Sequence, residues 1–178
     1  MNISQRLESA HSKENSLEIV SYIGNDKIRF QELMNCFLLG TKDYRVPQRA
    51  AHAVSLCFDK NPSLIQPYIP ELVQLLENPD LKGSLKRNIL RILRFSEIEE
   101  NLRGTLYSRT FELLADPKEE IAVRAFSMTV LYNITQYYRE LKQELKAMIE
   151  MVLSEPKVFP GVKSRGEKTL FLLNKELP

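Results

Sequence analysis

One short phrase recurs along this chain at a nearly constant spacing. It consists of two large aliphatic residues, a spacer, a polar residue and a proline, and it occurs at residues 75–79, 113–117 and 152–156. The three copies begin 38 and 39 residues apart. Self-similarity at a fixed period in this range is typical of proteins built from stacked structural repeats. The phrase therefore constrains the fold more strongly than any other feature of the sequence.

The segments between these phrases have the periodicity of amphipathic helices. The helices that follow the loops align on anchor positions at residues 12, 46, 85, 123 and 162. Positions 4, 5, 7, 8 and 11 after each anchor are mostly small or apolar, and they share one face of a helix with about 3.6 residues per turn. A proline pushes the residue before it out of the α region, so each phrase closes a helix. No segment shows sustained period-two alternation, and we predict an all-α fold.

Two copies of the second helix resemble the HEAT-repeat family of armadillo-like solenoids, in which two antiparallel helices are joined by a tight turn containing Asp-Pro. Val123-Arg124 with Asp116-Pro117 is the closest copy, and residues 46–54 are the next. The resemblance implies a right-handed α-α superhelix of about five antiparallel helix pairs, in a single domain over residues 1–178. The approximate repeats are residues 1–25, 26–60, 64–97, 99–136 and 138–177. The resemblance also implies a structural ladder between neighbouring repeats, in which Arg124 pairs with an acidic residue of a loop. Asp116 fits that role.

In such solenoids the second helices line the concave surface, so their solvent-facing positions are the natural site for a partner. The middle repeat differs from the others there, because its second helix carries four cations on three turns without an acidic residue. Arginine side chains suit carboxylates and phosphates, which they bind with two parallel hydrogen bonds. We predict a partner-binding surface on the concave face, made of Lys86, Arg87, Arg91, Arg94, His52 and Lys168.

The cationic row has more than one interpretation. A charged run can be a solvated helix face, here paired with Glu97, Glu99 or Glu100. If the row binds a partner, an acidic protein or peptide segment is the favoured one. Nucleic acid, held by its phosphates, is the alternative, because a phosphate backbone also presents closely spaced anions. The formal net charge of +2 is too small to imply nucleic acid by itself.

Motifs of catalysis, cofactor binding and membrane insertion are missing from the sequence. There is no glycine-rich phosphate loop, no Gly-x-Ser-x-Gly and no His-Glu-x-x-His, and neither cysteine has a second Cys or His at metal-ligand spacing. We therefore expect a non-catalytic scaffold with no cofactor and no metal. Some HEAT-like proteins are DNA glycosylases that use tryptophan and a carboxylate, but this chain has no Trp, so that activity is a remote alternative. No apolar run approaches about 20 residues, and no apolar N-terminal stretch occurs, so we expect a cytoplasmic protein without membrane contact.

Overall fold

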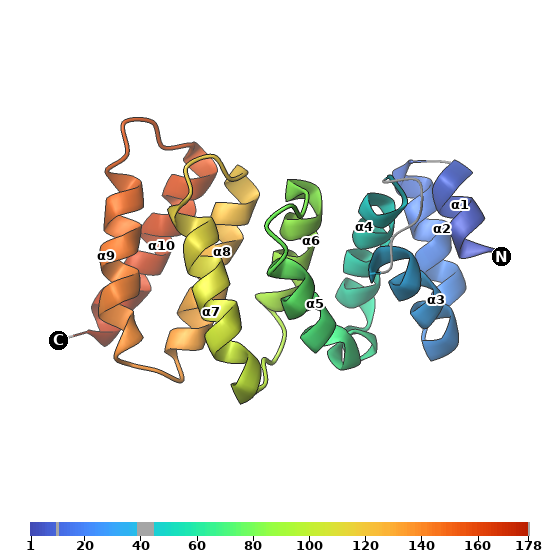
Figure 1. Ribbon diagram of the computed structural model, residues 1–178, viewed down its shortest axis with the longest axis horizontal. Helices are drawn as coiled ribbons and strands as arrows, with labels where there is room; N and C mark the ends of the chain where they lie inside the picture. The colour runs from blue at the N-terminus through green and yellow to red at the C-terminus, as the bar shows by residue number, and fades with distance from the viewer. Residues whose placement is uncertain (10, 39–44, 178) are drawn as a thin grey trace. The chain divides into compact units, whose positions relative to one another are not determined.

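A computed structural model describes residues 1–9, 11–38 and 45–177 of the chain. Within these residues it contains ten α-helices, two short 3-10 helices and no strand (Figure 1), so the prediction of an all-α fold is confirmed. The helices follow one another in five pairs, and each pair lies within one of the predicted repeat ranges. The bounds are α1 (Ile3–Ser9), α2 (Lys13–Ile23), α3 (Lys27–Leu38), α4 (Arg45–Lys60), η1 (Pro62–Leu64), η2 (Gln66–Tyr68), α5 (Ile69–Leu76), α6 (Gly83–Leu93), α7 (Glu100–Ala115), α8 (Ile121–Thr135), α9 (Leu141–Leu153) and α10 (Pro160–Glu176).

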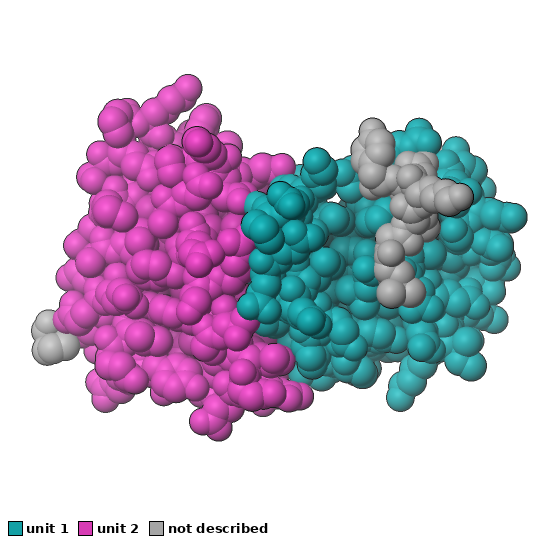
Figure 2. Space-filling model, viewed as in Figure 1, with its two compact units in different colours: residues 1–92 teal, residues 93–178 magenta. Residues whose placement is uncertain are grey.

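The chain folds into two compact units, residues 1–92 and residues 93–178 (Figure 2). The boundary falls at the end of α6, inside the third predicted repeat. Unit 1 holds the first two helix pairs, α5 and nearly all of α6, whereas unit 2 holds the last two pairs. Each unit buries apolar side chains of its own, so each has its own core.

Helix α4 is the centre of unit 1 and packs against α1, α2 and α3. Three alanines on its inner face, Ala50, Ala51 and Ala53, are fully buried, and their small side chains allow these helices to approach closely. Arg49 of the same helix donates hydrogen bonds to the carbonyl oxygens of Leu7 (2.6 Å) and Glu8 (3.0 Å). These carbonyls belong to the last turn of α1, where no further helical turn satisfies them. The basic residue of α4 thus fastens the first repeat to the second.

Helix α8 has the corresponding central place in unit 2, where it packs against α7, α9 and α10. The core around it consists of apolar side chains that are at most 1% exposed: Leu114, Met128, Leu131, Leu145, Ile149, Val152, Val162 and Leu173. Burying aliphatic side chains of this kind stabilises a fold by roughly 1.5–3 kcal/mol each. These residues recur at the spacing that the aligned repeats predict, so the sequence period and the core coincide.

Arg124 of α8 has the structural role that the resemblance implies, with a different loop acid as its partner. Its guanidinium is buried, donates from Nε to the Leu114 carbonyl (3.0 Å) and from Nη1 and Nη2 to the Glu155 carboxylate (2.9 and 2.5 Å). Glu155 is the loop acid of the following repeat, so the pair joins neighbouring repeats. Asp116 does not take this place, because its carboxylate accepts the main-chain N–H of Lys118 within its own turn (2.8 Å).

Candidate partner-binding surfaces

The six residues predicted to form one binding surface belong to both units. His52, Lys86, Arg87 and Arg91 lie in unit 1, and Arg94 and Lys168 lie in unit 2. His52 projects from α4, and the three neighbouring cations of unit 1 come from α6. The grouping of all six in a single surface stays a prediction.

Arg87, Arg91 and His52 form the cationic face of unit 1. Arg87 is exposed, and among the described residues it makes no ion pair. Arg91 is half-buried and pairs with Asp59 of α4, with 2.5 Å between Nη2 and Oδ2. This partner differs from the glutamates 97, 99 and 100 that the sequence had suggested, because Asp59 is 32 residues earlier in the chain and only the packing of the helices brings it near.

His52 reports the electrostatic character of this face. Its Nδ1 lies 3.3 Å from the Ser16 hydroxyl. Burial lowers the pKa of His52, and the positive charges of His11, Arg91 and Arg87 lower it further. Two arginines of α6 and His11 from the segment before α2 thus act on the one imidazole of α4. The neutral imidazole is favoured, and the local field is one that attracts anions.

Lys86 does not belong to the exposed part of this face, which corrects its predicted place. Only 7% of the residue is exposed, whereas its neighbour Arg87 is open to solvent. The reason is helical geometry, because consecutive residues are rotated by about 100° around the axis of α6. A side chain one position before an outward-facing residue therefore turns toward the packed side of the helix.

The two predicted residues of unit 2 occupy different surroundings. Arg94 follows directly on α6, and its guanidinium stacks over Phe126 (4.1 Å to the ring centroid) and Phe95 (4.5 Å). Its main-chain carbonyl accepts a hydrogen bond from the Asn133 amide (2.8 Å). Lys168 is exposed on α10 and makes no ion pair with any residue that the structure describes. Lys168 is accessible to an anionic partner, and Arg94 is half-buried and held in place by its aromatic neighbours.

Sequence reasoning missed a pair of adjacent hollows on unit 2. The first has a volume of about 360 Å³ and lies between the segment 93–98 and the end of α8. The second has a volume of about 520 Å³ and lies between the start of α7, the end of α8 and the start of α9. Arg103 and Ile134 line both hollows. The one local signal was Gly104, a glycine inside a segment with a helical pattern. The hollows themselves form only where the two helices of this repeat pack against each other and against the neighbouring segments.

The described residues form five successive helix pairs, and a buried arginine joins one repeat to the loop acid of the next. This arrangement defines an α-helical repeat protein. A family model described as a HEAT repeat domain matches residues 3–171, which is nearly the whole chain. The chain therefore belongs to the HEAT-repeat family, and this membership makes it a repeat protein of the scaffold and binding class. No curated protein and no solved structure matches the chain significantly.

Two further searches of the described residues bear on the kind of site. None of the helices described combines the length and the apolar character that crossing a bilayer requires. Within the same residues, no group of three or more His, Cys, Asp and Glu side chains is arranged to hold a metal ion.

Proposed function

We propose that this HEAT-repeat protein is a non-catalytic scaffold that binds an acidic protein or peptide segment through its second-helix surface. The cationic face of α4 and α6 is the centre of this interaction. The observation that carries the proposal is the exposed Arg87, which has no ion-pair partner among the described residues, next to Arg91 and His52. Arg94 and Lys168 of unit 2 are further contacts to the same class of partner.

The ion pair within this face is weak enough for an acidic partner to replace it. The pair between Arg91 and Asp59 is about one third to one half exposed. Pairs of this kind contribute roughly 0–1 kcal/mol, so a carboxylate of a partner can replace Asp59 at little cost. Arg87 requires no such exchange. Two arginines one helical turn apart can then bind successive carboxylates with paired hydrogen bonds, which are stronger than those of neutral groups.

Fluorescence anisotropy with a labelled peptide of alternating Glu and Ser, 12 residues long, tests the proposal. The variant Arg87→Glu/Arg91→Glu is expected to bind at least about tenfold more weakly, since losing roughly 1.4 kcal/mol corresponds to a factor of ten. The matched control is Lys27→Glu/Lys82→Glu, which makes the same change of charge at two exposed lysines of unit 1 outside the face. An equal loss of peptide affinity in both variants would show a general charge effect and would refute a binding site on α4 and α6.

The same assay distinguishes the nucleic-acid alternative. A labelled DNA oligonucleotide, single-stranded or duplex, is titrated at several salt concentrations. Binding to phosphates weakens steeply as salt rises, because bound arginines release condensed counterions. Tighter binding of DNA than of the acidic peptide, lost in Arg87→Glu/Arg91→Glu, would reject the acidic segment as the partner and assign the face to nucleic acid.

A further inference from the structure

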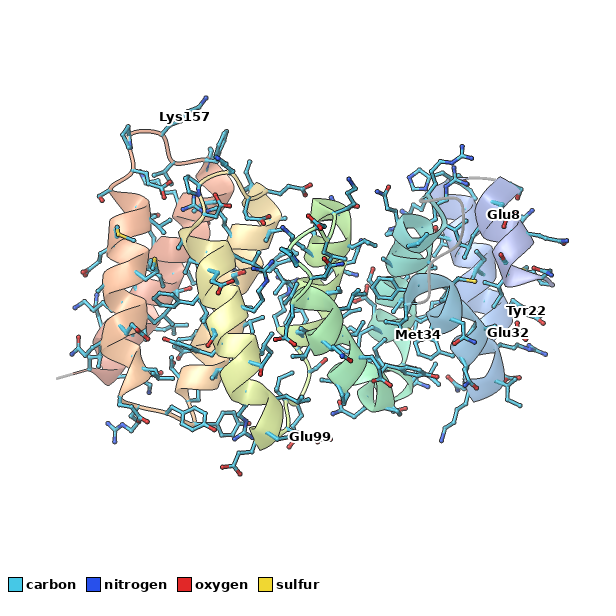
Figure 3. All side chains as sticks on the ribbon, in the orientation of Figure 1. Glu8, Tyr22, Glu32, Met34, Glu99 and Lys157 are labelled. Carbon is cyan, nitrogen blue, oxygen red and sulfur yellow. The ribbon has the colours of Figure 1, made fainter. Side chains whose placement is uncertain are left out.

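The two hollows of unit 2 adjoin one another at one arginine. Arg103 of α7 and Ile134 of α8 line both of them. The start of α7 and the end of α8 lie at the same edge of the unit in Figure 1, and Glu99, labelled in Figure 3, marks this edge. We call the whole feature the Arg103 groove and define it by Phe95, Ile98, Arg103, Gly104, Ile134 and Tyr137.

Arg103 is held rigidly, and its terminal nitrogens are available. Its Nε donates to the Ile98 carbonyl (2.9 Å), and its guanidinium lies 3.6 Å from the ring centroid of Tyr137. Among the described residues it makes no ion pair with a carboxylate. A guanidinium that is fixed before binding loses little side-chain entropy when it binds an anion. The centre of the groove is therefore prepared for one carboxylate.

The hollows on both sides of Arg103 are partly open and combine apolar with polar lining residues. The first hollow has a floor of buried side chains that includes Val130 and Ile134, and the large rings of Phe95 and Tyr137 on its rim are 67% and 56% exposed. Exposed aromatic rings beside an arginine are typical of protein–protein contact sites. A cation between two hollows that each offer apolar side chains fits successive side chains of a peptide better than it fits one small molecule.

Gly104 keeps the second hollow open. It lies inside α7, a position where glycine destabilises a helix relative to alanine. A Cβ atom built on Gly104 meets no other atom within 4 Å, so packing gives no reason for a glycine there. The missing side chain instead leaves space at the second hollow that a large side chain would fill.

We propose that the Arg103 groove binds an extended peptide segment in which an acidic residue is flanked by two apolar residues. Alternate side chains of an extended chain point to the same side and are about 7 Å apart, so the pattern is apolar-x-acidic-x-apolar. The carboxylate binds Arg103, and the two apolar side chains enter the hollows. Glu97 and Glu100 also line the groove, so the groove disfavours strongly acidic segments. It would therefore bind a different class of peptide from the one proposed for the α4 and α6 face.

Fluorescence anisotropy on the full chain tests this groove with three labelled heptapeptides. The probe contains Phe-Ser-Asp-Ser-Leu, the second peptide has Asn in place of Asp, and the third has the composition of the probe in scrambled order. We expect the probe to bind at least tenfold more tightly than either of the others. The variant Arg103→Gln should abolish the preference for Asp over Asn, and Gly104→Phe should weaken binding of the probe at least tenfold.

Matched variants separate a binding effect from a folding effect. Gly104→Ala places only a methyl group in the open space and should bind the probe as the wild type does. Phe159→Ser removes an exposed ring of unit 2 outside the groove and should also leave binding unchanged, whereas Tyr137→Ala should weaken it. Circular dichroism confirms that each variant keeps its helical content.

Several results would overturn the proposal. These are equal binding of the probe and the scrambled peptide, or unchanged binding to folded Gly104→Phe. A concentration-dependent dimer that Tyr137→Ala dissociates, without any binding of the probe, would assign the groove to a second copy of the chain. The Arg87→Glu/Arg91→Glu variant should still bind the probe, and Gly104→Phe should still bind the Glu-Ser peptide, so failure of one proposal is distinguishable from failure of the other.

Discussion

Removing the charge of Arg124 is the sharpest test of what holds the repeats of unit 2 together. The substitution Arg124→Met keeps most of the aliphatic volume of the side chain and removes all its donors. The Leu114 carbonyl then has no donor from this side chain, and the Glu155 carboxylate loses its bidentate counter-ion. Both consequences affect the junction between α8 and the loop that precedes α10.

The magnitude follows from the exposure of the two partners. Removing one member of a buried ion pair costs about 3–5 kcal/mol, because the other charge is left without compensation. The Arg124 side chain is 5% exposed, but that of Glu155 is 24% exposed, so water can reach the carboxylate. We therefore expect a loss near the lower limit, about 3 kcal/mol of local stability, which corresponds to roughly a hundredfold change in an opening constant.

Hydrogen exchange measured by mass spectrometry detects this loss of local stability in individual segments of the chain. Peptides from α8 and from the α9–α10 loop should exchange about a hundredfold faster in Arg124→Met, because local opening exposes their amides. The control is Lys146→Met, which removes an ion pair with Glu150 of α9 whose side chains are 32% and 54% exposed. Exposed pairs of this spacing contribute about 0.3–0.5 kcal/mol, so exchange should change only about twofold.

The pH dependence of stability gives a second test of the pair between Arg124 and Glu155. The hydrogen bonds from Arg124 lower the pKa of Glu155 below its ordinary value of 4.5, and this effect exceeds the opposing effect of burial. A carboxyl group whose pKa is lower in the folded state stabilises the fold above its unfolded pKa and loses that contribution as the pH falls through its folded pKa. The difference between wild type and Arg124→Met should therefore shrink below pH 4.5. A loss of less than 1 kcal/mol, or one that is constant from pH 7 to pH 3, would refute the reasoning.

Two further predictions concern unit 2. Gly104→Ala should raise the free energy of unfolding by about 0.5–1 kcal/mol, since the new Cβ meets open space. Gly166→Ala should lower it by about 1–3 kcal/mol, since its Cβ would lie 2.9 Å from a side-chain carbon of Leu153. Urea denaturation followed by circular dichroism compares the two variants. Hydrogen bonds from Lys142 and Tyr132 lower the pKa of Glu176 to about 2, so its stabilising contribution is present above pH 4.5 and is lost as the pH falls toward 2. The variant Glu176→Gln should lower stability by about 1–2 kcal/mol at pH 7 and by much less at pH 2, measured by thermal denaturation at both values.

Local patterns were sufficient to predict the helices and their pairing. The proline of each phrase acts on the residue directly before it, and an apolar face is set by residues three and four positions apart. Both effects operate within a few residues, so helices form where the local pattern predicts them in the described part of the chain. The structural role of Arg124 came from the resemblance to HEAT repeats, in which this arginine joins neighbouring repeats.

Which side chains meet was decided by the tertiary structure. Arg124 pairs with Glu155, 31 residues later, whereas the sequence indicated Asp116. Arg91 pairs with Asp59, 32 residues earlier, whereas the sequence indicated a glutamate just after the helix. The burial of Lys86 and the hollow beside Gly104 likewise depend on which neighbouring helix covers a given face. The helical period fixes the direction of a side chain around its own axis, but the distance to a residue one repeat away is set only when the helices pack.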